Sequence, residues 1–240
     1  MSLLLADIKT YFRQFPTALA ISYSINRTIA RVFDKDAATT YSQFGEDRVL
    51  PFFLNPERNG FYVDVGANHP VKCSNTFWLY KLGWRGITVE PNEMLSKLHQ
   101  KIRPLDTQVA ALVSDSGAEV EFVQFENHLF SSASADHVNQ WKDANNIVRR
   151  QKIKPRHLTG ILDECRSPQN FDLLCVDVEG FDLPVLRSLD WSKYHPKMLV
   201  IEMSDYLPGQ PHATVQFLAA KNFSLKAFDG FNGFFINVSA

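Results

Sequence analysis

The chain has 240 residues, of which 45% are hydrophobic and 21% charged, and its formal net charge is −1. These values indicate a soluble globular protein with one main domain and argue against a nucleic-acid partner. No apolar run reaches the roughly 18 residues that an integral membrane helix needs. The three cysteines, Cys73, Cys165 and Cys175, lack metal-ligand spacing and cannot all pair, which favours a reduced, cytoplasmic protein.

The chain is expected to begin with a helical extension over residues 1–40, before a domain over residues 41–240. Apolar side chains recur in the extension at approximate helical spacing, and Pro16 is expected to separate two helices. Such helices would pack on their own domain or join two subunits into a homodimer. A helix that lies on a membrane surface or docks a partner is the alternative.

Residues 41–54 are predicted to form a helix just before the first strand, with Ser42 as a plausible cap. A helix in this place often leans over the ligand. Gln43 and Glu46 are therefore candidates for ligand contact, and simple helix capping is the other interpretation for both.

Residues 61–92 contain the pattern that indicates a ligand. A buried strand over residues 61–65 leads into a turn at Gly66, a helix follows, and a second strand over residues 87–89 ends at Glu90. In an open parallel sheet, ligands bind at the carboxyl ends of the strands, and an acid about 20 residues past the loop holds a ribose. Glu90 follows Gly66 by 24 residues, so this stretch predicts a nucleoside-binding half-fold.

The glycine pattern separates two kinds of nucleoside ligand. The dinucleotide fingerprint would place glycines at positions 66, 68 and 71, but the chain has Asn68 and Val71 at the last two. S-adenosylmethionine has no phosphates and needs fewer glycines, and Asp64 with Gly66 suits it better. An ordinary strand–helix–strand turn with no ligand remains the alternative.

The remaining elements predict an α/β fold. Further strands are expected at residues 107–113, 119–125, 171–176 and 198–201, a helix at 158–165, and a terminal β-hairpin from residues 223–228 and 234–238. A doubly wound, Rossmann-like sheet closed by an antiparallel hairpin is the class I methyltransferase pattern.

Residues 126–156 are polar and are expected to be an irregular insert, either an acceptor-binding lid or a plain surface loop. His128, Ser131 and Ser132 would bind the substrate there. The basic residues at 149–156 would meet a phosphorylated or acidic acceptor, or simply form a solvated face.

Four predicted strands carry an acid at or near their carboxyl ends: Asp64, Glu90, Asp177 and Glu202. Four acids at one sheet edge would repel one another without a cationic ligand, a metal or bridging donors. The sulfonium and ammonium groups of S-adenosylmethionine supply positive charge.

Methyl transfer to an alcohol also needs a group that takes the hydroxyl proton, or a metal that raises its acidity. Asp177 is the first candidate at the reacting centre and Glu179 the second. His69 and His128 are rival bases, although the position of His69 favours a structural or cofactor-contact role.

A metal is a further alternative. The oxygen ligands for Mg²⁺ would come from Asp177, Glu179, Glu202 and Asp205. Against this, Glu179 and Asp182 would merely cap the following helix.

Four segments together resemble the FkbM-type methyltransferase family over approximately residues 41–240. They are SQFGEDR (42–48), FYVDVGANHP (61–70), SNTFWLYKLGWRGITVEPN (74–92) and FDLLCVDVEGFDLPVL (171–186). The resemblance implies a class I fold, S-adenosylmethionine as donor and O-methylation of a small molecule or sugar. It also implies that Asp64, Gly66, Ala67 and Asn68 line the cofactor, that Glu90 holds the ribose, and that Asp177 with Glu179 faces the transfer site. Pro70 stands where the family often has glycine.

We therefore predict an S-adenosylmethionine-dependent O-methyltransferase that acts on a hydroxyl of a saccharide or other small metabolite. The alternatives are a non-catalytic nucleoside-binding scaffold and an NAD-binding oxidoreductase. The predicted cofactor contacts are Gln43, Asp64, Gly66, Ala67, Asn68, His69, Asn75, Glu90, Asn92 and Ala111, and the predicted substrate contacts are His128, Ser131, Ser132 and Glu202.

Overall fold

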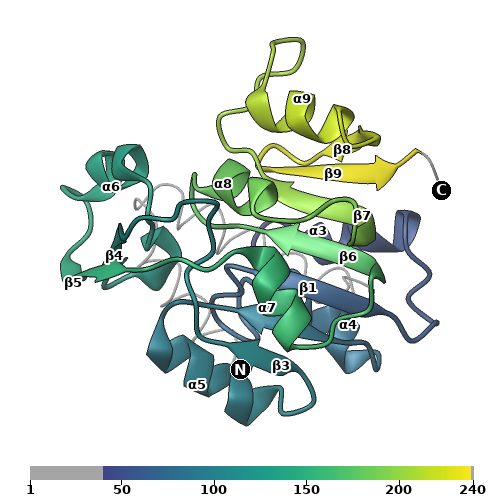
Figure 1. Ribbon diagram of the computed structural model, residues 1–240, viewed down its shortest axis with the longest axis horizontal. Helices are drawn as coiled ribbons and strands as arrows, with labels where there is room; N and C mark the ends of the chain where they lie inside the picture. Colours follow the sequence, from purple (N-terminus) through teal and green to yellow (C-terminus); the bar gives the residue numbers. More distant parts are fainter. Residues whose placement is uncertain (1–39, 239–240) are drawn as a thin grey trace, which may run out of the picture. The chain divides into compact units, whose positions relative to one another are not determined.

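The computed structural model describes residues 40–238, in which seven strands form a central sheet in the order β3-β2-β1-β6-β7-β9-β8 (Figure 1). The strands are β1 (Phe61–Val65), β2 (Arg85–Val89), β3 (Thr107–Val109), β6 (Asn170–Val176), β7 (His195–Glu202), β8 (Phe223–Phe228) and β9 (Asn232–Asn237). The first five strands in this order are parallel, whereas β9 runs antiparallel to both β7 and β8. The predicted doubly wound sheet with a closing hairpin is confirmed.

Helices precede the first strand of the sheet and connect most of the later ones. They are α3 (Glu46–Val49) with the 3₁₀ turn η1 (Leu50–Phe52), α4 (Phe77–Lys81), α5 (Glu93–Ile102), α7 (Leu158–Glu164), α8 (Asp182–Arg187) and α9 (Ala213–Ala219). Because each connection returns the chain to the start of the next parallel strand, the carboxyl ends of the strands share one edge.

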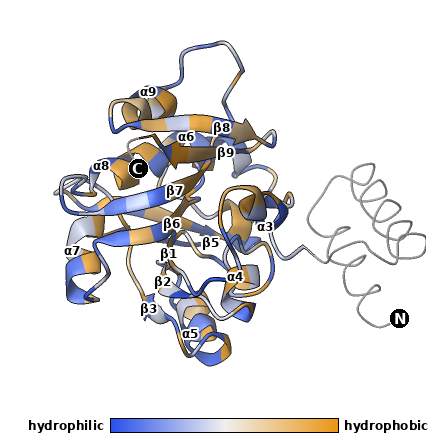
Figure 2. Cartoon of the chain, turned by 90° about the vertical axis from the view of Figure 1, so that its right-hand side faces the viewer, coloured by the Kyte–Doolittle hydropathy of each residue, from blue (hydrophilic) through white to orange (hydrophobic). Residues whose placement is uncertain are grey.

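Each face of the sheet has its own hydrophobic core, because successive side chains of a strand point to opposite faces. Val63 of β1 packs in one core, which also contains residues of α7, α8 and α9. Its neighbour Tyr62 packs in the other, together with Leu50 of η1 and Leu79 of α4. Figure 2 shows hydrophobic residues along β9 and the inner part of β6.

The region between β3 and α7 contains a second, smaller sheet. It pairs β4 (Val120–Phe125) with β5 (Ile147–Ile153) in antiparallel fashion, and η2 (His128–Phe130) and α6 (Ala135–Trp141) lie between them in the chain (Figure 1). The expectation that residues 126–156 are irregular was therefore wrong. The strand β5 was not predicted from the sequence because it is exposed along most of its length and carries no apolar run.

The third strand is shorter than predicted, since β3 ends at Val109 and not at Val113. Val113 instead makes an isolated parallel bridge to Arg156. The chain between these points leaves the sheet and becomes available to line the site described below.

The predicted N-terminal helices, and the homodimer that they would form, lie outside the described residues. Among residues 40–238, no helix is both long enough and apolar enough to cross a membrane.

Candidate active site

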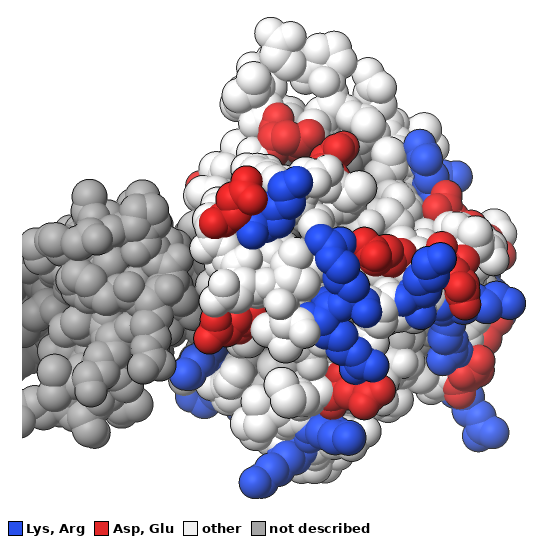
Figure 3. All heavy atoms as spheres, turned by 90° about the vertical axis from the view of Figure 1, so that its left-hand side faces the viewer, with Lys and Arg blue, Asp and Glu red and all other residues white. Residues whose placement is uncertain are grey.

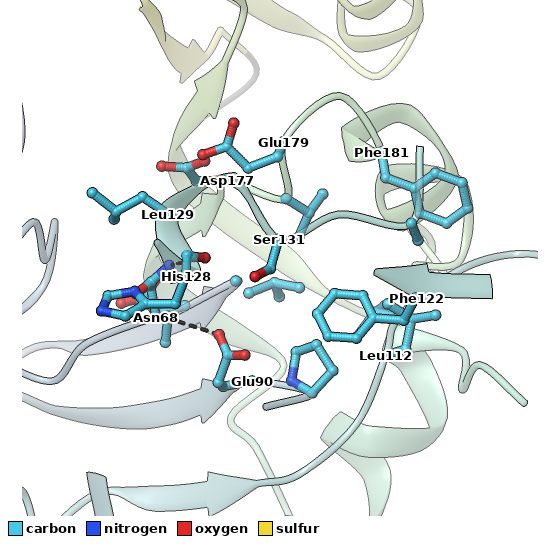
Figure 4. Close-up of a pocket in the computed structure, with 18 of the residues that line it drawn as sticks. Asn68, Glu90, Leu112, Phe122, His128, Leu129, Ser131, Asp177, Glu179 and Phe181 are labelled. Atoms are coloured by element: carbon cyan, nitrogen blue, oxygen red, sulfur yellow. Dashed lines mark hydrogen bonds between the residues drawn. The ribbon is translucent and has the colours of Figure 1, made fainter. Parts of the chain in front are cut away.

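The carboxyl ends of β1, β2 and β6 face a cleft (Figure 4). Its volume is about 820 Å³, including the solvent space at its open mouth. Residues of the β4–β5 insert cover part of it, among them His128 and Ser131. The predicted site residues that line the cleft are Gln43, Asp64, Gly66, Ala67, Asn68, Asn75, Glu90, Ala111, His128, Ser131, Asp177 and Glu179. The structure thus brings together most of the residues that the sequence singled out, from both halves of the chain.

The turn after β1 approaches the end of β6 more closely than a side chain would allow. Gly66 has a φ of +80°, and a Cβ atom on it would lie 1.8 Å from the backbone carbonyl oxygen of Asp177. The backbone N–H groups of Gly66 and Ala67 donate to the carbonyl oxygen of Val89, at 3.0 and 3.2 Å. Glycine is therefore required here, because the turn is hydrogen-bonded to the end of β2 and lies directly against the end of β6.

Glu90 follows β2 with its carboxylate held in place by two backbone donors. Its Oε2 accepts from the Asn68 N–H at 3.0 Å (Figure 4), and its Oε1 accepts from the Asn92 N–H at 2.7 Å. Burial raises the pKa of Glu90 to about 7, although these two hydrogen bonds act in the opposite direction. Each oxygen keeps a lone pair, so the fixed carboxylate can still accept from two hydroxyl groups of a ligand.

An apolar wall stands beside Glu90. It is formed by Ala111 and Leu112, from the segment that leaves β3, and by Phe122 of β4 (Figure 4). All three are buried. A flat aromatic base can pack against such a wall while its ribose reaches Glu90.

Asp177 and Glu179 lie in the other part of the cleft (Figure 4). Burial raises the pKa of Asp177 well above its usual range, and the charges of Glu202 and Asp182 raise it further. The pKa of Glu179 is raised well above its usual range in the same way, first by burial and then by Glu202 and Asp177. These carboxyl groups therefore attract a proton or a positively charged group.

The backbone turn after β6 places Glu179 among the residues that line the cleft. Glu179 and Gly180 both have positive φ, at 54° and 82°. The insert contacts this turn: Ser132 Oγ donates to the Glu179 carbonyl oxygen at 2.8 Å, and His137 Nε2 lies 3.5 Å from Glu179 Oε2.

Three of the four predicted metal ligands lie together. Carboxylate oxygens of Asp177, Glu179 and Glu202 all lie within 4.8 Å of one another. The structure does not bring Asp205 to them, since this exposed carboxylate lies 2.9 Å from Nε2 of His212.

Four predicted contact residues are not among those that line the cleft: His69, Asn92, Ser132 and Glu202. His69 Nδ1 accepts from the N–H groups of Val71 and Lys72, so it shapes the loop. Asn92 positions Glu90 and also caps α5, because its Oδ1 accepts from the Met94 N–H. Ser132 donates a hydrogen bond to the Glu179 backbone, and the carboxylate of Glu202 lies near that of Glu179.

Sequence reasoning missed two buried groups close to Asp177. Asp182, on α8, was considered only as a helix cap, and Asn232 was not considered. Asn232 Nδ2 donates to Glu46 Oε1 at 2.7 Å, and Glu46 is one of the charges that raise the pKa of Asp177. No local signal marks Asn232, because β9 reaches Glu202 only through the insertion of the terminal hairpin beside β7.

A buried polar network behind β1 was also missed. Thr76 Oγ1 donates to Asp64 Oδ2 at 2.5 Å and accepts from Arg103 Nη2 at 3.0 Å. Arg103 Nε in turn donates to Asp106 Oδ2 at 2.8 Å, and the Tyr62 hydroxyl donates to the same carboxylate. The network holds the Asp64 carboxylate in place.

The profile of the methyltransferase FkbM domain matches residues 64–225, which is more than half of the chain. The match leaves residues 42–48 outside it, although Gln43 lines the cleft. Comparison with curated protein sequences gives no significant match.

Solved structures similar to this chain include a TehB-like SAM-dependent methyltransferase from Corynebacterium glutamicum, with a TM-score of 0.42, 14% identity and coverage of 92% of this chain and 100% of that one. A methyltransferase from Geobacter sulfurreducens has a TM-score of 0.45, 12% identity and coverage of 97% and 96%. The O-methyltransferase from Bacillus cereus in complex with SAH has a TM-score of 0.45, 12% identity and coverage of 89% and 96%.

The family match coincides with the residues that form the cleft, from Asp64 at its start through Glu90 to Asp177. The chain belongs to the FkbM methyltransferase family and is an S-adenosylmethionine-dependent methyltransferase with a class I fold.

Proposed function

We propose that the protein transfers a methyl group from S-adenosylmethionine to a hydroxyl of a saccharide or other small metabolite. One observation carries this proposal: a fixed carboxylate and an apolar wall form one half of the cleft, and crowded, partly buried carboxyl groups form the other. We also propose that it acts in the cytoplasm, as its three cysteines suggest.

The donor half fits an adenosine-bearing cation. Glu90 would accept from the ribose hydroxyls, and Ala111 with Leu112 would contact the adenine. Oδ1 of Asn68 lines this region as a buried acceptor without a hydrogen-bond partner, and it would accept from the ammonium of the donor. When bound, the donor supplies a methyl carbon activated by its positively charged sulfur.

Asp177 is the proposed general base. It would take the proton of the acceptor hydroxyl while that oxygen bonds to the methyl carbon, and the electron pair of the broken carbon–sulfur bond would stay on sulfur. A raised pKa makes a carboxylate a better proton acceptor near neutral pH, and a positioned base contributes about 10²–10⁴-fold in rate. Glu179, beside it, is the second candidate.

Calorimetry with S-adenosylhomocysteine tests the donor site, with NAD as the control ligand. We expect saturable binding of the first and none of the second. Tight binding of NAD alone would contradict the proposal.

A methyl-transfer assay tests the chemistry. The assay follows release of S-adenosylhomocysteine in the presence of a panel of saccharides and small alcohols, with and without EDTA. We expect turnover that survives EDTA, because Asp177 supplies the base. Turnover that EDTA abolishes and Mg²⁺ restores would instead assign Asp177, Glu179 and Glu202 to a metal ion.

A further inference from the structure

The loop after β1 contains a residue in a strained backbone conformation. Asn68 has a φ of +45°, in the left-handed region that residues other than glycine rarely adopt. Such a conformation persists only where the surrounding structure holds it in place. Asn68 also lines the cleft, so the contacts that hold its backbone also set the position of its side chain there.

Hydrogen bonds hold the backbone of Asn68 on both sides. Its N–H donates to Glu90 Oε2 at 3.0 Å, and its carbonyl oxygen lies 2.9 Å from Nε2 of His99, in the second half of α5. Asn92, which caps α5, donates its own N–H to Glu90 Oε1. Both contacts to Asn68 therefore come from one connected segment, which runs from the end of β2 into α5.

The contact with Asn68 identifies the nitrogen of His99 that carries the hydrogen. A carbonyl oxygen only accepts hydrogen bonds, so Nε2 must be the donor. Burial lowers the pKa of His99 to about 4, so the ring is neutral near pH 7 and its Nδ1 carries no hydrogen. This buried Nδ1 has no hydrogen-bond partner among the described residues. Buried polar atoms are normally paired, so packing alone does not account for a histidine at this position.

The side chain of Asn68 connects the loop to the cleft and to the insert. Its Nδ2 donates to the His128 carbonyl oxygen at 3.4 Å, and its Oδ1 is a buried acceptor without a partner. Figure 4 shows Asn68 close to His128 and linked to Glu90. A rotation of the backbone at Asn68 would therefore displace an acceptor of the cleft and a contact of the insert together.

The contact between the insert and Asn68 involves neutral groups. Charged side chains of the insert pair on its surface instead, as Arg150 does with Glu121 at 2.7 Å. Figure 3, which views the side of the molecule that carries the insert, shows basic and acidic residues interspersed, as expected for a solvated face. Salt screens exposed ion pairs and has little effect on hydrogen bonds between neutral groups. An effect of His99 on the loop should therefore not depend on ionic strength.

We propose that His99 is a positioning residue of the donor site, which holds Asn68 in the left-handed conformation that cofactor binding requires. His99 is not among the residues that line the cleft, so it acts through the carbonyl oxygen of Asn68 and not on the ligand. With this oxygen fixed, the Asn68 N–H stays on Glu90, and Oδ1 stays in place for the ammonium of S-adenosylmethionine. This inference rests on the proposed function and adds a residue to the same site.

Two amide variants separate the hydrogen bond of His99 from the packing of its ring. Glutamine places its side-chain N–H close to the position of the histidine Nε2, whereas asparagine is one methylene shorter and cannot reach it. Calorimetry on the full chain should show a Kd for S-adenosylhomocysteine within about threefold of the wild type for His99→Gln and about tenfold higher for His99→Asn. Both ratios should be the same at low and high salt.

A double-mutant cycle with Asn68→Gly tests whether His99 acts through Asn68. Glycine adopts a φ of +45° without strain, so His99→Asn should change the Kd by about twofold or less in the Asn68→Gly background. Leu95→Ala is the packing control, because Leu95 is buried on the same helix and does not line the cleft. It should lower the midpoint of urea unfolding and leave the Kd unchanged.

Three results would overturn the inference while the donor site stands. They are equal Kd values in His99→Gln and His99→Asn, an undiminished effect of His99→Asn in the Asn68→Gly background, and a Leu95→Ala variant that binds as weakly as His99→Asn. A wild type that does not bind S-adenosylhomocysteine would instead remove the proposed function and this inference together.

Discussion

The two halves of the cleft hold their carboxyl groups in different ways. Glu90 accepts from two backbone N–H groups at 3.0 and 2.7 Å, so its position is set before any ligand arrives. Asp177 and Glu179 have Glu202 and Asp182 as neighbours, and these acids repel one another. A carboxylate with fixed donors is suited to binding, whereas crowded carboxyl groups are suited to accepting a proton. Under the proposed function, the same type of side chain would serve recognition in one half and chemistry in the other.

Gly66→Ala should have the largest effect, because Gly66 lies where the two halves meet. Its new Cβ would lie 1.8 Å from the Asp177 carbonyl oxygen, at a φ of +80°. We expect a loss of about 3 kcal/mol or more of unfolding free energy, measured by urea denaturation, and loss of S-adenosylhomocysteine binding.

Gly209→Ala is the matched control for this prediction. Gly209 has a similar φ of +86°, but nothing lies within 4 Å of an added Cβ. It should cost only about 1–2 kcal/mol, the penalty of the left-handed conformation. Equal losses of unfolding free energy in the two variants would show that the close approach of Gly66 to Asp177 does not affect stability.

Asp177→Asn should separate chemistry from binding. The amide cannot take the acceptor proton, so we expect kcat to fall by about 10²–10⁴-fold. Calorimetry should show nearly unchanged affinity for S-adenosylhomocysteine, since Glu90 and the apolar wall are intact. A parallel loss of affinity would place Asp177 in the donor half.

Glu90→Gln should show its effect in binding and in the pH dependence of stability. The pKa of Glu90 is about 7 in the folded protein, against 4.5 as its ordinary value. The folded state therefore binds more protons than the unfolded state in this range, and stability falls as the pH rises. Relative to the variant, the wild type should lose about 2 kcal/mol of unfolding free energy between about pH 5 and pH 8.

Urea unfolding of both proteins across this range measures that difference, and a difference independent of pH would contradict the pKa. Calorimetry should show about tenfold weaker binding of S-adenosylhomocysteine to Glu90→Gln, because a charged acceptor for the ribose is lost.

Substitutions of Glu202 and Asp205 should have the smallest effects, and their difference tests which acids belong to the carboxyl cluster. Glu202 belongs to the carboxyl cluster, whereas Asp205 is exposed beside His212. We expect Glu202→Gln to lower kcat about tenfold through its neighbours and Asp205→Asn to change it by about twofold at most. Similar effects in the two variants would extend the cluster to Asp205.

The central sheet could be predicted from the sequence because its strands are buried and apolar, as residues 61–65 and 171–176 illustrate. The part of the cleft around Glu90 could also be predicted, because Asp64, Gly66 and Glu90 lie on or next to consecutive strands joined by a short helix. These features are local, so spacing along the chain reports position in space.

Asp177 and Glu179 could be predicted from the sequence, but the contacts around them join distant segments and could not. Glu46 meets Asn232, 186 residues later, only after β9 inserts beside β7. The strand β5 was missed because a strand exposed on both faces has no alternation of apolar and polar residues.

The insert between β4 and β5 has a small hydrophobic cluster of its own. Val123, Phe125 and Val138 are buried together, and Phe130 and Trp141 pack against them. This cluster shares no buried residue with the two cores of the main sheet, so the insert carries its own internal packing. Grafting the corresponding segment of a relative would replace the roof of the cleft, including Phe122 and the Ser132 contact to Glu179, and would leave Glu90, Ala111 and Leu112 in place.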